Sequence, residues 1–136
     1  MKLKKVLIIL ITLIIIVIVS TLLHYKNMNY ISENWNIDFP PENTIVYQVK
    51  PSPSFTNDGI YYEVQESKSK KLPITLSNKK NNEIEEFNKY IIEAKVSQKQ
   101  LPDFTQDYKY YKKSDVGRSL IVVAQDQLLY IVSYNL

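Results

Sequence analysis

Residues 6–23 read VLIILITLIIIVIVSTLL, and this stretch decides how the rest of the chain is organised. It is eighteen residues long and carries no charged side chain. As a helix it would span about 27 Å, close to the thickness of about 30 Å of a bilayer's hydrocarbon core. Lys2, Lys4 and Lys5 precede it and a polar sequence follows. We therefore predict a transmembrane helix over 6–23, in preference to a buried helix of a soluble domain.

A cleaved secretory signal is the main alternative, because it too begins with basic residues and an apolar run. Its apolar core usually has about 7–15 residues and ends at an Ala-x-Ala-like site. Here the run is longer, and the best small residue, Ser20, has Ile18 two positions before it. The chain contains no cysteine that could carry a lipid. An uncleaved signal-anchor is therefore expected.

Charge sets the expected orientation of this helix. Three lysines precede the span, whereas Lys26 is the only lysine or arginine between the span and Lys50. The positive-inside rule then places residues 1–5 in the cytoplasm and the C-terminal part outside the cell membrane. Residues 24–36 are expected to form a juxtamembrane stalk, in which tyrosine rings favour the membrane–water interface. The residues predicted at that interface are Tyr25, Lys26 and Tyr30.

The part of the chain after the predicted span has equal numbers of basic and acidic residues. The chain has 17 lysines and arginines, and three of them precede the span, which leaves 14 against 14 aspartates and glutamates. A neutral outer part argues against a nucleic-acid partner, whose phosphates require a basic surface. The lack of cysteine excludes a disulfide framework and fits an exported domain of a bacterium with a single membrane.

Residues 37–136 are predicted to form one small α+β domain. Alternating, β-branched or strongly apolar runs indicate five strands, and Asn57-Asp58-Gly59 and Asp115-Val116-Gly117 are turn signals. A helix is predicted over 83–97, because its apolar residues recur at a spacing of three to four and its first turn is acidic. The predicted strands are 44–50, 60–67, 108–112, 120–125 and 128–134. The order β-β-α-β-β-β predicts a mostly antiparallel sheet with one packed helix, and the last two strands form a central hairpin.

The sequence contains no motif typical of catalysis, metal binding or cofactor binding. It has a single histidine, no cysteine and only two glycines, so neither a zinc site of the usual composition nor a phosphate-binding loop is expected. The loop carboxylates Asp103, Asp107 and Asp115 lack the pairing expected of a general acid and base. We therefore expect neither an enzyme nor a cofactor. The alternative is a cell-wall or lipid hydrolase that uses these carboxylates.

Tyrosine is the one residue in surplus, with eleven in the chain. Neighbouring tyrosines on one strand point to both faces of a sheet, and exposed tyrosine is typical of protein interfaces. An AT-rich genome that uses tyrosine as a β-former would give the same composition. The residues predicted to form a partner surface are Tyr61, Tyr108, Tyr110 and Tyr111.

A resemblance supports an extracytoplasmic domain. The pattern Trp35-x-Ile37-x-Phe39-Pro40, then Ser54-Phe55, then Asp58-Gly59-x-Tyr61, resembles small membrane-anchored exported proteins of Firmicutes. Those proteins have no assigned activity, so the resemblance implies a location and no reaction or ligand.

These observations predict a single-pass, membrane-anchored module that lies outside the cytoplasm and binds a protein. Its partner would be another membrane or cell-envelope protein, and its role accessory, regulatory or immunity-type. Besides the hydrolase, a third possibility is a module that binds a ligand at the membrane surface, suggested by Lys26 and the interfacial rings.

Overall fold

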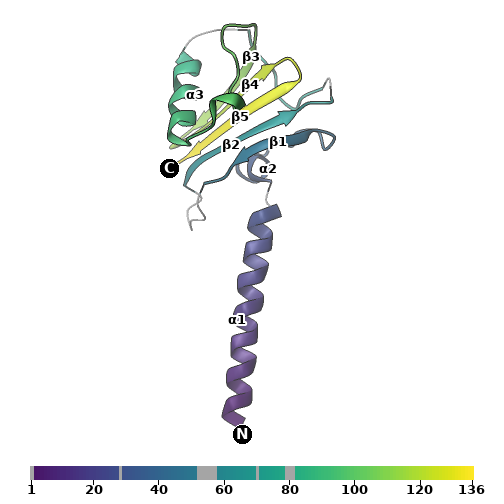
Figure 1. Cartoon of the computed structure of the whole chain (residues 1–136), viewed down its shortest axis with the longest axis vertical. Coiled ribbons are helices and arrows are strands. Elements are labelled where there is room, and N and C mark those ends of the chain that lie inside the picture. The colour runs from purple at the N-terminus through teal and green to yellow at the C-terminus, as the bar shows by residue number, and fades with distance from the viewer. Residues whose placement is uncertain (1, 28, 52–57, 70, 79–81) are drawn as a thin grey trace.

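The computed structural model describes residues 2–27, 29–51, 58–69, 71–78 and 82–136. A long helix, α1 (Lys2–Asn27), stands apart from a folded domain that begins at residue 29 (Figure 1). Ser54, Phe55 and Asn57, which the sequence patterns included, lie outside the described residues. The same is true of the side chains of Tyr25 and Lys26.

Helix α1 has the length and composition of a membrane span. Among the described residues it is the one helix long and apolar enough to cross a bilayer, over Lys5–Leu23, and none of that segment is buried against the domain. Its two threonine hydroxyls donate hydrogen bonds within the helix, from Thr12 to the Ile8 carbonyl and from Thr21 to the Val17 carbonyl. Lipid offers no hydrogen-bond partners, so this internal pairing suits the polar groups of a spanning helix.

The domain is built on a five-stranded antiparallel sheet in the order β1-β2-β5-β4-β3. The strands are β1 (Thr44–Val49), β2 (Gly59–Glu66), β3 (Lys109–Asp115), β4 (Arg118–Gln125) and β5 (Leu128–Asn135). Helix α3 (Asn82–Glu93) and the short 3-10 helix η1 (Gln98–Gln100) connect β2 to β3. The predicted α+β class, the order of elements and the hairpin of the last two strands are confirmed.

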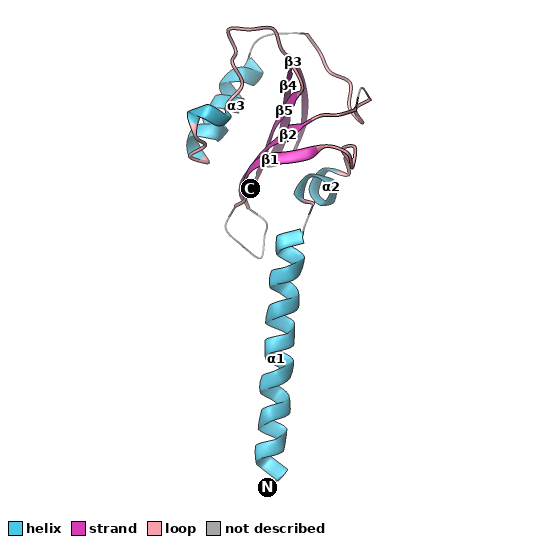
Figure 2. Cartoon of the chain, turned by 45° about the vertical axis from the view of Figure 1, so that its right-hand side comes forward, coloured by secondary structure: helices cyan, strands magenta, loops and turns pink. Residues whose placement is uncertain are grey.

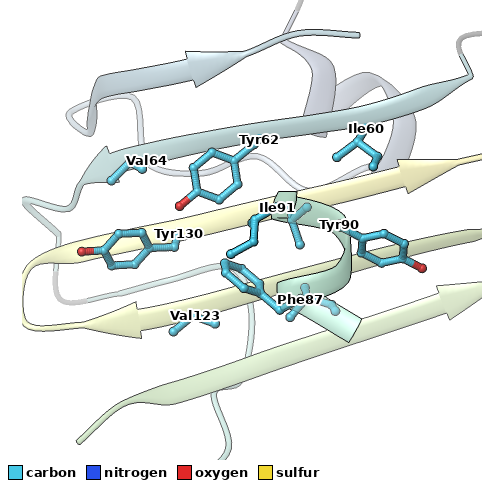
Figure 3. Close-up of a cluster of buried hydrophobic side chains, with 10 residues drawn as sticks. Ile60, Tyr62, Val64, Phe87, Tyr90, Ile91, Val123 and Tyr130 are labelled. Carbon is cyan, nitrogen blue, oxygen red and sulfur yellow. The ribbon is translucent and has the colours of Figure 1, made fainter. Parts of the chain in front are cut away.

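Helix α3 packs across one face of the sheet through its apolar stripe. Phe87 is fully buried against Tyr62 of β2, with ring centroids 6.2 Å apart in an edge-to-face arrangement (Figure 3). Tyr90 stacks on Tyr134 of β5 with centroids 4.8 Å apart. Burial of such large rings is the main source of stability on this face. The buried cluster comprises Ile60, Tyr62, Val64, Phe87, Tyr90, Ile91, Ile121, Val123, Tyr130 and Val132.

The opposite face is covered by a short helix that the sequence patterns did not predict, α2 (Tyr30–Trp35) (Figure 2). Asn29 caps its start, because the Asn29 side chain accepts a hydrogen bond from the Ser32 amide at 3.1 Å. The helix ends at Asn36, whose φ of 54° is left-handed. Its buried side chains are Tyr30, Ile31 and Trp35.

The structure therefore differs from the stalk expected over residues 24–36. From Tyr30 onward this segment belongs to the domain core, and Tyr30, only 1% exposed, is not a residue of the membrane interface. The physical reason is that both faces of β4 and β5 are apolar and need cover, and α2 supplies it on the second face. The domain thus has three layers, with the sheet between α3 and α2.

Candidate functional site

The two edge strands of the sheet differ in charge and in cover. On β3, Lys109, Lys112 and Lys113 are exposed, and the backbone of Tyr110 exchanges hydrogen bonds of 2.7 and 2.9 Å with Ser77. Strand β1 reads TIVYQV and carries no charged side chain. Within the described part of the chain, β2 is the one strand that pairs with β1, so the outer side of β1 is open.

Two apolar side chains of β1 are exposed to solvent. Ile45 is 51% exposed and Val46 is 52% exposed. The register with β2 shifts between Ile45 and Tyr47, so Val46 is an extra residue without a partner on β2. Such a bulge bends the strand locally, while pairing continues normally from Tyr47 to Val49. The result is an edge with a small apolar surface at its start and a regular segment after it.

A chain of polar side chains ties this edge to the sheet, and its three members on β2, Tyr61, Glu63 and Gln65, are buried. Gln48 of β1 donates a hydrogen bond of 2.5 Å to the Tyr61 hydroxyl, which in turn donates to one oxygen of Glu63. Gln65 donates to the other Glu63 oxygen at 2.6 Å. Asn43, just before β1, donates to the Gln65 carbonyl oxygen at 2.9 Å. Five side chains thus hold β1 and the turn before it against β2.

Glu63 is the charged group at the centre of this network. It is 2% exposed, and burial raises its pKa, although hydrogen bonds from Tyr61, Gln65 and Gln48 act in the opposite direction. Burial, together with the charge of Glu63, also raises the pKa of Tyr61, so this hydroxyl stays a donor at physiological pH. Because the carboxyl is enclosed and fully hydrogen-bonded, its arrangement is that of a structural group that positions β1.

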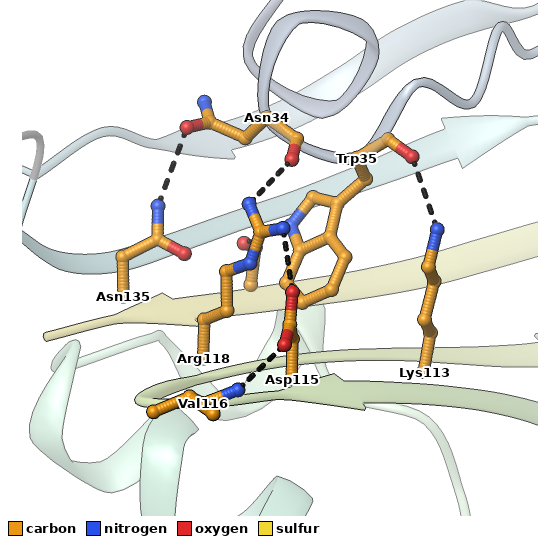
Figure 4. A network of polar contacts seen from close by, with 8 residues as sticks. Asn34, Trp35, Lys113, Asp115, Val116, Arg118 and Asn135 are labelled. Carbon is orange, nitrogen blue, oxygen red and sulfur yellow. Dashed lines mark hydrogen bonds and ion pairs between the residues drawn. The ribbon is translucent and has the colours of Figure 1, made fainter.

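A second polar cluster fixes α2 to the ends of β4 and β5 (Figure 4). The Trp35 indole donates a hydrogen bond of 2.7 Å to the Ser133 hydroxyl. The Arg118 guanidinium lies 5.0 Å from the centre of the Trp35 ring and donates to the Asn34 carbonyl at 3.0 Å. Arg118 also pairs with Asp115 at 2.9 Å. These contacts join the helix that follows α1 to the β3–β4 turn.

The predicted tyrosine surface is only partly formed. Tyr61 is buried and stacks on Tyr30 with ring centroids 4.4 Å apart, so its assignment to a partner surface is corrected. The cause is that α2 covers the face on which Tyr61 lies. Tyr108, Tyr110 and Tyr111 are half-buried, and Tyr108 packs edge-to-face on Phe104 with centroids 5.2 Å apart.

The loop carboxylates Asp103 and Asp115 bind groups of neighbouring residues in their own loops. Asp103 accepts hydrogen bonds from the Thr105 hydroxyl at 2.6 Å and amide at 3.0 Å, and these bonds lower its pKa. The Arg118 ion pair and the Val116 amide likewise lower the pKa of Asp115. In the described ranges there is no group of three His, Cys, Asp or Glu side chains that could hold a metal ion.

Asp107 lies elsewhere, in a hollow of about 830 Å³ beside the β4–β5 turn. The hollow has apolar walls, including Leu72, Leu76 and Leu129. Its charged groups among the described residues are Lys68 and Lys109 together with Asp107 and Asp126.

No protein-family model matches the chain, and no curated protein or solved structure is found to be similar to it. The site most distinct in its geometry is therefore the open edge of β1. Sequence patterns predicted β1 as a strand but not as an edge. The uncharged run TIVYQV was the available signal, but the sequence does not reveal the strand order, in which β5 pairs with β2 and leaves β1 at the edge.

Proposed function

We propose that the protein is a single-pass membrane protein whose domain lies outside the cytoplasm and binds another cell-envelope protein through the β1 edge. The observation that carries the proposal is the open, uncharged edge with exposed Ile45 and Val46. A strand edge presents unpaired backbone N–H and C=O groups, which an extended segment of another protein can pair with.

The contrast with β3 supports the choice of β1. Natural sheets protect their edges with lysines and with short covering segments. Strand β3 has both, in its three lysines and in the bridge to Ser77. Strand β1 has neither among the described residues, and its bulge at Val46 protects only its start. A partner strand therefore fits β1 better than β3.

The location follows from α1. Its apolar span and the three preceding lysines favour insertion in the cell membrane with the N-terminus in the cytoplasm. A neutral domain without a metal or catalytic motif favours an accessory, regulatory or immunity-type role over catalysis. The partner would present an extended segment with apolar side chains to Ile45 and Val46, which suits a membrane or envelope protein and not a nucleic acid.

Photocrosslinking in membranes tests this proposal. A benzophenone amino acid is placed at Val46 in the full chain, and at Lys113 on β3 in a matched variant, since both side chains are exposed. We expect a discrete protein adduct from position 46 and none from 113. Equal adducts at both edges, or no adduct at 46 in membranes that retain the protein, would contradict the proposal.

A further inference from the structure

We propose that the domain also rests on the bilayer through an apolar tip formed by Val116 in the β3–β4 turn and Leu136 at the C-terminus. The occupant of this tip is the lipid headgroup–acyl boundary. The inference depends on the membrane anchoring proposed above and is independent of the β1 partner.

Both side chains are exposed, and Leu136 lies against Gly117, the residue after Val116. Val116 is 97% exposed and Leu136 is 78% exposed. The Leu136 amide donates a hydrogen bond of 2.9 Å to the Gly117 carbonyl, next to Val116. A Cβ at Gly117 would lie 3.5 Å from the Leu136 Cβ, so the C-terminal side chain sits directly against the turn.

The opposite end of the sheet provides the contrast. The β4–β5 turn has Asp126 and Gln127 at its tip, both exposed and polar, as is usual for a turn. The β3–β4 turn also has two residues, but its left-handed residue is the second, Gly117 at a φ of 72°, and valine takes the exposed first position where the other turn has Asp126. Of the two hairpin tips that the structure describes in full, only that between β3 and β4 exposes a large apolar side chain.

The hydrogen bonds of α2 hold the apolar tip near α1. Tyr30 follows Asn27, the last residue of α1, by three residues. The distance between their Cα atoms is therefore at most roughly 11 Å. The Tyr30 hydroxyl accepts a hydrogen bond of 3.1 Å from Asn135, the residue before Leu136. In both views the C-terminus lies on the side of the domain that faces α1 (Figures 1 and 2).

These lengths place the tip within reach of the membrane surface. The apolar span ends at Leu23, and the four residues from there to Asn27 rise only about 6 Å. The interfacial layer on each side of the hydrocarbon core is roughly 5–8 Å thick. A domain tied this closely to the span can bring its C-terminal end to the lipid.

The charges beside the tip suit a lipid surface of either charge. Arg118 and Lys113 lie next to it, where phosphate groups of lipids would be, but Asp115 pairs with Arg118. We therefore attribute the contact to the two apolar side chains and expect it in zwitterionic as well as anionic bilayers. Docking in this way would fix the orientation of the domain, with the β4–β5 turn pointing away from the membrane.

The absence of cysteine makes a clean test possible. The full chain is prepared as V116C and as Q127C, each labelled with an environment-sensitive nitrobenzoxadiazole fluorophore. Both are reconstituted in vesicles of phosphatidylcholine alone and with phosphatidylglycerol. We expect the label at 116 to emit further to the blue and to be quenched severalfold more strongly by nitroxide-labelled lipid than the label at 127. Adding L136D to the V116C variant should reduce that quenching toward the level at 127.

Equal emission and quenching at the two positions would overturn the inference. Alkaline carbonate extraction of the same vesicles separates the two ways of failing. If the protein is retained and the labels behave alike, the bilayer contact is refuted and the anchor stands. If the protein is released, the anchoring is refuted and the bilayer contact with it.

Discussion

Strands β1 and β3 close the two sides of one antiparallel sheet, but their edges are built in opposite ways. Strand β3 carries lysines outward and pairs with Ser77, and an ion pair joins its Lys112 to Glu86 of α3. Strand β1 carries no charged side chain and is held to β2 by the chain of side-chain hydrogen bonds from Gln48 to Asn43. The comparison shows that an edge strand can be held firmly in the sheet and still have unpaired backbone groups. The contacts that hold β1 run to β2, so the outer backbone groups of β1 stay open to a partner.

The largest expected effect comes from breaking the fixation of β1. Tyr61→Ala removes the ring that stacks on Tyr30 and the hydroxyl that bridges Gln48 to Glu63. Loss of a buried aromatic side chain typically lowers the free energy of unfolding by about 3–5 kcal/mol. Chemical denaturation of the full chain in detergent micelles measures this change in the free energy of unfolding.

Tyr61→Phe is the matched control, since it keeps the stacked ring and removes only the hydroxyl. We expect a loss of about 1–3 kcal/mol, because Glu63 loses one donor and stays buried. If Tyr61→Phe costs nothing, the hydroxyl contributes nothing beyond the stacked ring, and the proposed support of β1 by the polar chain is wrong.

The next effect concerns binding at the open edge. Val46→Lys gives β1 the kind of charge that protects β3, and should weaken partner binding at least about tenfold, or about 1.4 kcal/mol. The yield of adducts from a crosslinker at Thr44, which is also exposed, measures the change. Ser114→Lys on β3 is the control and should leave the yield unaltered. An undiminished yield with Val46→Lys would place the partner elsewhere.

The Glu63 carboxyl gives the β1 side a pH dependence opposite in sign to that of Glu86 and Asp115 on the β3 side, whose pKa values are lowered. Its folded-state pKa is raised above the ordinary 4.5, so the folded form binds the proton more tightly than the unfolded form. The free energy of unfolding therefore falls as pH rises from 4.5 to the folded-state pKa, by about 1.4 kcal/mol per unit of pKa difference. Unfolding midpoints between pH 4 and 8 measure this slope.

Glu63→Gln should flatten that slope, because an amide does not titrate. Tyr61 can accept from the new amide and donate to Gln48 once the Gln48 amide turns, so the network stays paired. We expect the variant to gain stability relative to the parent as pH rises. An identical slope in the two proteins would show that Glu63 titrates alike in the folded and unfolded states.

Local sequence patterns were sufficient to predict the strands of the sheet and helix α3. They were insufficient to predict that β1 is an open edge strand. Strands β4 and β5 are continuous apolar runs, and α3 repeats its apolar side chains through Ile84, Phe87 and Ile91. The six residues of α2 are too few to show a period. Its burial arises from contacts across about a hundred residues, such as that between Trp35 and Ser133.

The candidate site depended even more on such distant contacts. The spacing of Tyr61, Glu63 and Gln65 puts them on one face of a strand, but the sequence does not reveal whether that face is covered. Its cover comes from α2, which is far from β2 in the chain. The expected tyrosine surface failed at Tyr61 for this reason, and the open edge of β1 emerged only from the strand order.

The smallest expected effect comes from the ion pair that links β3 to α3. Burial works to raise the pKa of Glu86, but hydrogen bonds from Lys112 and Tyr90 outweigh it, so this pKa lies below its usual range. Both partners remain partly exposed, and such pairs contribute roughly 0.2–1 kcal/mol. Lys112→Ala should therefore lower the free energy of unfolding by no more than this amount, and by less at high salt. Because Lys109 and the Ser77 bridge remain, the crosslinker that replaces Lys113 should still form no adduct. An adduct at 113 in this variant would mean that one lysine alone keeps β3 closed, and the difference between the two edges would then depend on Lys112 alone.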